Sequence, residues 1–492
     1  MSTFTVSGEQ STGYESMQTT SGMRTVQELK NVANSISIVN SQLITDLAAI
    51  TIEDMTQWTV TGEANPDPTV VSGSSRLIFR GIQNNYAIRN GWIWYSPIDA
   101  YSTDRLELLR GPNAFLYGEA DLGGAQNQIT KRGLFTKNFS RVKLIAGSND
   151  LYRGELDINR RLNDQLAVRV AAVKSVNKTW WDHGERDFRG IYGAVTYRPF
   201  RNTTVTVMGE VANSTEVRSQ GLFADNFSYT TTTTLANAAG VAYLPVNGSN
   251  YRLTGRLVSR GPGATVVDPL IVPREAQFNG PNATNKSDQK SLSFEVEHNI
   301  GRNLHLLLSG NYYTTDTSIM AASSRVISRD LNPTLPNGAA NPYYNELYTE
   351  YYRTRQVGGN VVRDIRLSAV YDLELSWMKQ QIVINASQHQ DNPGQKYPKM
   401  GEYVIPGTSA FVGTVRTDLT QAGFVANRAT FTNNRFMRRY YLKDGDGGKI
   451  TGSVDPVAGL SDYFPDFSGT VVPAGGALID RRFYTPSLGV GA

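Results

Sequence analysis

From residue 138 onward, apolar and polar side chains alternate along successive segments of the chain. Apolar Tyr152, Leu156 and Ile158, for example, alternate with charged Arg153 and Asp157. The same pattern returns in three later segments: residues 204–211, 292–297 and 365–372. Side chains two positions apart lie on the same face of a strand, so each segment predicts a strand with one apolar and one polar face.

The spacing of these strands distinguishes between two architectures, a soluble sandwich and a membrane barrel. The first hairpin has a short turn at residues 148–151, and past it short and long connections are expected to alternate. The short ones lie at residues 161–164, 199–202 and 300–303, and the long ones at residues 179–187, 216–290, 318–361 and 391–428. A membrane barrel has tight turns at one end, long loops at the other and a polar interior. Only a closed barrel satisfies every backbone group of a β-structure in lipid. We therefore favour a membrane all-β barrel, with about nine to ten antiparallel strands present.

The first third of the chain has a mixed pattern instead. Strand-like alternation and helix-like spacing of apolar residues both occur there, together with capping and turn residues. The expected elements are a strand over residues 29–40, a helix capped by Ser41, a second helix from Thr51 through Trp58, a strand over residues 76–82 and a tight turn at residues 89–91.

Residues 104–132 carry the most distinctive motif. A charged-apolar alternation at residues 104–109 predicts a half-buried strand, which Arg110, Gly111 and Pro112 end. Gly123 and Gly124 then turn the chain into a second short strand, which ends on a basic pair.

This stretch resembles the closing part of the plug domain of TonB-dependent outer-membrane receptors. The resemblance extends over residues 25–133 and departs from the family pattern at Asp104 and Gln126. The motif positions assigned from it are Arg80, Gly81, Glu107, Arg110, Gly111, Pro112, Tyr117, Gly118, Gly123 and Gly124. It implies an N-terminal mixed α/β plug domain joined to a barrel.

The resemblance also implies a division of the chain into three parts. Residues 1–25 are expected to form a flexible arm, residues 26–136 the plug, and residues 137–492 the N-terminal part of the barrel with long extracellular loops. The polar N-terminus has no signal-peptide pattern and the last residues form no amphipathic strand, so we expect a fragment of a longer protein. Family members keep a TonB box in the arm.

Two sets of residues are candidates for binding. Phe4, Thr5, Val6 and Ser7 form a short β-prone segment that would serve as the TonB box, with plain linker as the alternative. A second, aromatic set lies in a segment expected to be a loop at the plug apex: Trp92, Trp94 and Tyr95. In the family this loop contacts the ligand. Internal packing is the alternative, and the sequence leaves both open.

Charged residues in the barrel strands and in the plug are expected to hold the two together. Lumen-facing candidates are Arg153, Glu155, Asp157 and Arg169, and candidates within the plug are Arg80, Arg110 and Glu107. Buried charged hydrogen bonds between such groups are short and strong.

Composition excludes several other functions. The chain has no cysteine, four scattered histidines and a net charge of +4 with its basic residues dispersed. These features predict no metal site, no cofactor and no nucleic-acid partner. No phosphate-binding loop, nucleophile elbow or catalytic triad is present, so we do not expect an enzyme.

The functional hypothesis is therefore implied by the family resemblance. It is TonB-dependent active transport of a scarce solute, most often a ferric siderophore, across the bacterial outer membrane. The implied partners are TonB with ExbB and ExbD, outer-membrane lipid and the solute. The alternative is a passive porin-like or adhesin-type outer-membrane β-protein without an energised step.

Overall fold

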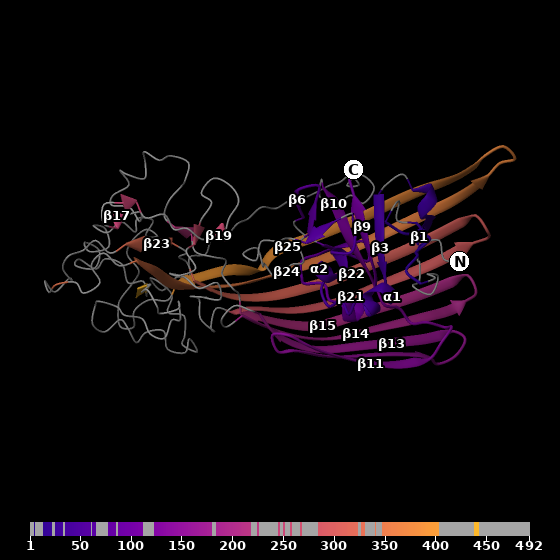
Figure 1. Ribbon diagram of the computed structural model, residues 1–492. Helices are drawn as coiled ribbons and strands as arrows, with labels where there is room; N and C mark the ends of the chain where they lie inside the picture. Colours follow the sequence, from indigo (N-terminus) through magenta and orange to yellow (C-terminus); the bar gives the residue numbers. More distant parts are fainter. Residues whose placement is uncertain are drawn as a thin grey trace.

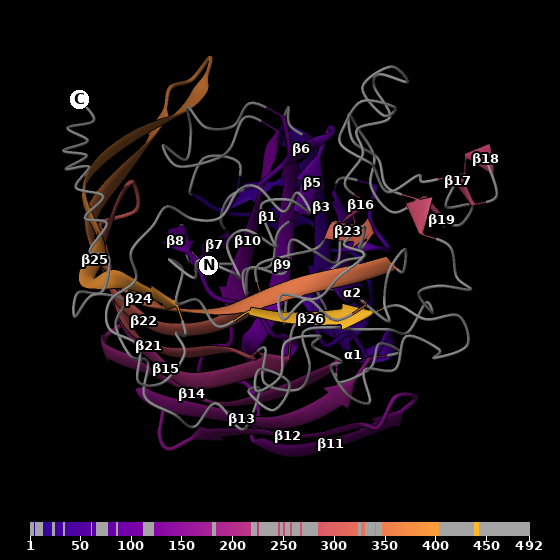
Figure 2. The ribbon, with the colours of Figure 1, turned by 90° about the vertical axis from the view of Figure 1, so that its left-hand side faces the viewer.

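The computed structural model consists of a small mixed domain seated inside a large curved sheet (Figures 1 and 2). It describes residue 4, residues 13–217 apart from 22–24, 33–34, 61, 65–76, 85–86, 112–122 and 180–183, and residues 284–322 and 347–402. Short strand segments between residues 224 and 340, and residues 437–441, are also described.

The long strands of the curved sheet are antiparallel to one another and follow in chain order. They are β11 (Phe139–Gly147), β12 (Leu151–Arg161), β13 (Leu166–Lys178), β14 (Glu185–Phe200), β15 (Thr203–Val217), β21 (Thr284–Ile300), β22 (Leu304–Ala322), β24 (Leu347–Glu374) and β25 (Lys379–Glu402). Short strands extend the sheet near the start of β24: β16 (Ala224–Asp225), β23 (Val326–Arg329) and β26 (Met437–Tyr441). Other two-residue strands form separate pairs: β17 (Pro245–Val246) with β18 (Ser249–Asn250), and β19 (Arg256–Leu257) with β20 (Val266–Val267).

The expected alternation of short and long connections is confirmed. Four short turns lie at one end of the sheet: residues 162–165, 201–202, 301–303 and 375–378. The long connections lie at the other end, as hairpin topology requires. Several boundaries of the long connections were wrong. Strand β24 already begins at Leu347, inside the connection expected over residues 318–361, and β25 continues to Glu402, inside the one expected over residues 391–428. Strand β21 begins at Thr284, inside the connection expected over residues 216–290. We call these ends the short-turn end and the long-loop end.

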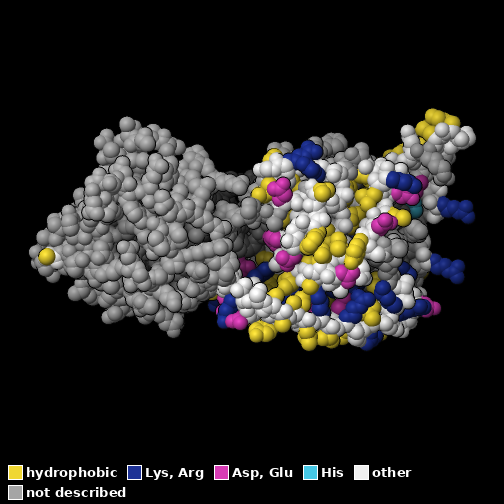
Figure 3. Space-filling model, in the orientation of Figure 1, with side chains coloured by type: hydrophobic (Ala, Val, Ile, Leu, Met, Phe, Trp, Pro, Cys, Tyr) yellow, Lys and Arg dark blue, Asp and Glu magenta, His cyan; other side chains and the backbone are white. Residues whose placement is uncertain are grey.

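The two faces of the curved sheet differ as the alternation predicts. Outward side chains are apolar and exposed, such as Leu144 at 79% and Ile191 at 64%, whereas inward Arg153, Asn159 and Arg169 are buried. Figure 3 shows hydrophobic side chains along the rim formed by the first strands of the sheet. No helix in the described part of the chain is long and apolar enough to cross a membrane.

The inner domain is built on a five-stranded sheet with strand order β3-β9-β10-β7-β8, in which only β10 and β7 run parallel. These strands are β3 (Ser35–Asn40), β7 (Ala87–Arg89), β8 (Trp92–Trp94), β9 (Thr103–Arg110) and β10 (Gly124–Thr130). The remaining elements are β1 (Gln18–Thr19), β2 (Gln27–Glu28), η2 (Leu29–Asn31), α1 (Ser41–Asp46), α2 (Ile52–Thr56), β4 (Glu63–Ala64), β5 (Leu77–Phe79), β6 (Ile82–Gln83) and η4 (Ala100–Ser102).

Local sequence explains both helices. The side chain of Asn40 caps α1 by accepting from the Leu43 amide, so the expected cap at Ser41 was one residue late. The capping box at α2 is confirmed, because the side chains of Thr51 and Asp54 each accept from the other's backbone amide. This helix ends at Thr56, before Trp58.

Three expected strands or loops needed correction. The strand over residues 29–40 divides into the 3-10 turn η2 and strand β3. The strand over residues 76–82 is broken by Arg80 and Gly81, both at positive φ, into the β5–β6 hairpin. The turn at residues 89–91 is confirmed, but Trp92 and Trp94 belong to strand β8 rather than to a loop.

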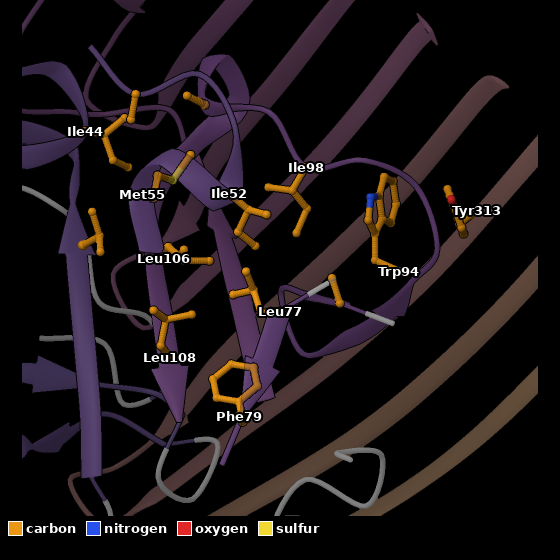
Figure 4. Packing of buried hydrophobic residues seen from close by; sticks show 14 of the residues in the cluster. Ile44, Ile52, Met55, Leu77, Phe79, Trp94, Ile98, Leu106, Leu108 and Tyr313 are labelled. Atoms are coloured by element: carbon orange, nitrogen blue, oxygen red, sulfur yellow. The ribbon is translucent and has the colours of Figure 1, made fainter. Parts of the chain in front are cut away.

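The core of the inner domain lies between its sheet and the two helices (Figure 4). Ile44, Ile52, Met55, Leu106 and Leu108 pack together there and are buried. On the opposite side of strand β9 the charged residues are buried too, so this strand is enclosed on both faces rather than half-buried as predicted. Residues before the sheet cover this face, because Thr19 donates to Glu107 and Arg105 donates to the Gln18 carbonyl oxygen.

Gly124 permits the close approach of β9 and β10. A Cβ atom there would lie 2.3 Å from the carbonyl oxygen of Leu109 and 2.9 Å from the ring of Phe79. We predict that Gly124→Ala destabilises the inner domain by about 1–3 kcal/mol through overpacking. The measurement is the denaturant midpoint of the purified protein, followed by tryptophan fluorescence.

Gly193→Ala is the matched control for this substitution. Its Cβ would meet nothing within 4 Å, so we expect a change within about 0.5 kcal/mol. Equal effects of the two substitutions would contradict the packing argument for Gly124.

Candidate functional site

The candidate site is the interface between the inner domain and the inward face of the curved sheet. One ion pair joins Arg153 of β12 to Asp99, which lies just before η4. The guanidinium donates two hydrogen bonds to the carboxylate, at 2.6 Å and 3.0 Å, and both side chains are buried. This bidentate geometry confirms that Arg153 contacts the inner domain, as the sequence predicted.

A second cluster of charged residues, centred on Asp157 of β12, joins the inner domain to strands β12 and β13. The carboxylate of Asp157 accepts from Lys131 at 2.9 Å and from Arg169 at 2.8 Å and 2.9 Å. Arg169 also lies 4.0 Å from Asp104 of β9. Burial lowers the pKa of Lys131, and the neighbouring Asp157 carboxylate opposes this shift. The cation thus depends on its partner to stay charged.

The basic pair that ends the inner domain therefore contacts the curved sheet at both residues. Arg132 donates two hydrogen bonds to Glu295 of β21, at 2.5 Å and 3.0 Å. The hydroxyl of Tyr192 donates to the Lys131 carbonyl oxygen at 2.6 Å. Residues 131 and 132 fix the exit of the chain from the inner domain.

Glu210 of β15 accepts from two residues of the inner domain. Arg89 donates to one carboxylate oxygen, and Tyr101 donates to the other at 2.5 Å. All three residues are buried. Burial raises the pKa of Tyr101, and the charge of Glu210 raises it further, so the phenol remains a donor.

The three aromatic candidates for ligand contact lie at the same interface. The ring of Trp94 stacks on Tyr313 of β22 with centroids 4.0 Å apart (Figure 4), and the guanidinium of Arg366 lies 3.9 Å from the Trp92 ring. Tyr95 is partly exposed, and its hydroxyl donates to Asp391 at 2.5 Å. Both tryptophans therefore pack against the curved sheet, and ligand contact by these residues stays a prediction.

The motif residues divide between described and undescribed parts of the chain. Gly111 and Gly123 lie beside the loop that joins β9 to β10, and Arg80 approaches Gly111. Glu107 is buried next to Arg105, whereas Arg110 is exposed. Pro112, Tyr117 and Gly118 lie outside the described residues.

The proposed TonB box is described at one residue. Phe4 is buried, with 7% of its surface exposed, while Thr5, Val6 and Ser7 lie outside the described residues. Its role stays a prediction.

Sequence reasoning missed several residues of the interface: Arg89, Asp99, Tyr101, Glu210 and Glu295. Arg89 and Glu210 are 121 residues apart in sequence, and no local pattern links them. The available signal was the alternation along each strand of the curved sheet, which places Glu210 and Glu295 on the inward, polar face. Among the described residues, no group of three or more metal-ligating side chains is arranged to hold a metal ion.

Loss of a buried ion pair at this interface is expected to lower stability much more than loss of an exposed pair. Arg153→Met leaves the Asp99 carboxylate buried next to an apolar chain, and we expect a loss of about 3–5 kcal/mol in the stability of the seated inner domain. Lys174→Met is the control, because its pair with Asp187 is exposed and is expected to contribute about 0–1 kcal/mol. Protease protection of the inner domain measures both, and similar losses would contradict the account.

Comparison with known proteins identifies the inner domain. The family model described as the TonB-dependent Receptor Plug Domain matches residues 28–125. The metal-pseudopaline receptor of Pseudomonas aeruginosa is 26% identical over 217 residues, covering 43% of this chain and 30% of that receptor. The ferripyoverdine receptor of the same species is 36% identical over 107 residues, covering 21% of this chain and 13% of that receptor.

A solved structure extends the likeness to the curved sheet. The outer-membrane ferripyoverdine receptor of Pseudomonas aeruginosa, bound to ferripyoverdine, superposes with a TM-score of 0.59 at 17% identity. The match covers 82% of this chain and 47% of that receptor, so the chain spans about half the length of the solved relative. The inner domain is a plug, and the curved sheet is part of the wall of a β-barrel. Residues 28–125 thus match the plug domain of TonB-dependent receptors, and the chain has the fold of part of an outer-membrane receptor.

Proposed function

We propose that this chain contains the plug and the first part of the barrel of a receptor that actively takes up a scarce solute across the bacterial outer membrane. The observation that carries the proposal is the plug seated against the barrel wall by buried ion pairs, such as Arg153 with Asp99 and Arg89 with Glu210. A plug held in this way obstructs passive diffusion. Passage then requires work to rearrange the plug, which favours transport over a porin-like function.

The source of that work lies outside the chain. The outer membrane has no nucleotide supply, so energy must come through a partner that spans the periplasm. We infer that this partner is TonB, driven by ExbB and ExbD, and that it pulls on the N-terminal arm. The plug would then have two conformational states. Solute at the long-loop end and TonB at the short-turn end would each shift the equilibrium between these states.

The division of the chain follows from this mechanism. We propose residues 1–25 as the arm, residues 26–136 as the plug and residues 137–492 as barrel and extracellular loops. Within the arm, Phe4, Thr5, Val6 and Ser7 would add a strand to TonB through backbone hydrogen bonds. The exposed apolar side chains on the outer face of the curved sheet, such as Leu144 at 79% exposure, would contact outer-membrane lipid.

The solute class is proposed from relatives. Receptors with sequence similarity to this chain are named for ferrioxamine in Yersinia enterocolitica, ferrichrome in Escherichia coli and ferripyoverdine in Pseudomonas aeruginosa. We therefore propose a ferric siderophore as the substrate. Tyr95 of the plug is partly exposed, and its hydroxyl donates to Asp391 of the barrel wall. It is therefore the aromatic candidate best placed to contact the siderophore.

The energised step has a direct test in the full-length receptor. Deleting residues 3–7 is expected to abolish uptake of labelled ferric siderophore by iron-starved cells, while binding to the cell surface is unchanged. Val6→Pro is a finer test, because proline removes the backbone donor that strand addition needs. Val6→Ala keeps that donor and is the matched control, with uptake expected within about twofold of the parent.

Two results would contradict active transport. Uptake that survives the deletion would favour a passive pore, and surface binding without uptake in the unaltered receptor would favour an adhesin. Loss of binding in the deletion variant would show that residues 3–7 act in folding rather than in energy coupling.

A further inference from the structure

The outer face of the curved sheet carries a groove of about 670 Å³ that crosses strands β11 to β15. Its sides are exposed apolar side chains: Leu144, Leu156, Ile191 and Val211. Small residues lie between them, because Gly154 pairs with Leu144 and Ala172 pairs with Leu156 in neighbouring strands. The groove is therefore a hollow in the apolar surface, of a shape and chemistry that suit an acyl chain. We call it the outer groove.

Cations lie at the end of the outer groove that is nearer the long loops. Lys174 of β13 and Arg189 of β14 line this end and are direct cross-strand neighbours. Lys290 of β21 pairs with Val211, at the edge of the groove. All three cations are exposed. An apolar hollow thus ends in a group of basic side chains, on the same outward face.

Two carboxylates lie beside these cations, and each has a partner. Asp187 forms an ion pair with Lys174, and Asp288 accepts a hydrogen bond from Asn213. Three cations therefore face two carboxylates, and this end of the outer groove keeps a net positive charge.

Arg189 and Lys290 are the cations with unused bonding capacity. Arg189 donates from Nε to Asn213 at 3.2 Å, and in the described part of the chain neither Arg189 nor Lys290 forms an ion pair. Strand β15 lies between their strands, and their positions are offset by two residues. Strand spacing and rise then place their Cα atoms roughly 12 Å apart. Two long side chains at this separation can contact one headgroup that carries more than one phosphate.

We propose that the outer groove and its cations form a binding site for a phosphate-bearing lipid of the outer leaflet of the outer membrane. An acyl chain lies in the groove, and Arg189 and Lys290 bind phosphate oxygens. Arginine suits this role because its planar guanidinium can donate two parallel hydrogen bonds to a phosphate. The inference rests on the orientation given under the proposed function, with the long loops outside the cell, and goes beyond it by assigning a lipid site.

The phosphate contacts are tested with lipid A, an acylated disaccharide that carries phosphates, and with its dephosphorylated form. Native mass spectrometry of the purified protein in uncharged detergent micelles measures the affinity for each lipid. Replacing both cations, Arg189→Gln with Lys290→Gln, is expected to weaken binding of the phosphorylated form about thirtyfold, because each basic side chain contributes to the attraction of an anionic headgroup. The dephosphorylated form is expected to bind the parent as weakly as the phosphorylated form binds this variant.

A matched control removes the same charge from the other end of the sheet. Arg160 and Arg201 are exposed near the short turns. Arg160→Gln with Arg201→Gln is therefore expected to leave the affinity for the phosphorylated lipid within about twofold of the parent. An equal loss in both double variants, or equal binding of the two lipids by the parent, would overturn phosphate recognition at Arg189 and Lys290.

The acyl contact is tested by filling the outer groove. A Cβ atom on Gly154 would meet only Leu144, at 3.7 Å, so Gly154→Leu is compatible with the fold. The leucine displaces part of the acyl chain, and affinity is expected to fall at least about tenfold, since each methylene that leaves an apolar contact weakens binding. Gly193→Leu is the control, because Gly193 lies outside the groove lining and its Cβ would meet nothing within 4 Å.

Unchanged affinity in Gly154→Leu, or an equal loss in Gly193→Leu, would overturn the acyl contact. These outcomes are separate from the test of energised transport, which measures uptake after deletion of residues 3–7. Lipid binding that follows the expected pattern, in a receptor whose uptake survives that deletion, would overturn the proposed function and leave the lipid site intact.

Discussion

The structure depends on charge pairs buried between the plug and the barrel wall. Two such groups are Arg153 with Asp99, and Glu210 with Arg89 and Tyr101. Their mutual hydrogen bonds replace those that water would make, and without them the burial of these charges would cost free energy. Separating the partners would leave an unpaired buried charge. The pairs therefore hold the plug in one position, in addition to the fit between plug and wall. The same pairs would make its movement require work, and this links the fold to the proposed energised transport.

The plug has two kinds of attachment. Arg132 and Asp99 form bidentate ion pairs with the wall, whereas Thr19 near the N-terminus is bound to the plug sheet by a single hydrogen bond to Glu107. Bidentate charged pairs fix both distance and orientation, so the wall contacts determine the position of the plug in the lumen.

Sequence alone predicted the wall better than the plug. Wall strands such as β12 separate a polar lumen from an apolar exterior, so their alternation is visible in the sequence. Strand β9 was expected to be half-buried and is enclosed on both faces, because Gln18 and Thr19, which lie 87 and 88 residues before their partners Arg105 and Glu107, cover its charged face. Arg89 and Glu210 illustrate the same limit, since their pairing follows from strand order and register rather than from a local motif.

The conductance of the full-length receptor in a planar lipid bilayer, without any partner protein, tests the central claim most directly. A plug fixed by buried ion pairs obstructs the lumen, so the account predicts no steady ion conductance under an applied voltage. Conductance is expected to appear when denaturant loosens the plug and to disappear when denaturant is removed. A steady open pore in the untreated receptor would contradict the account and would favour a passive channel.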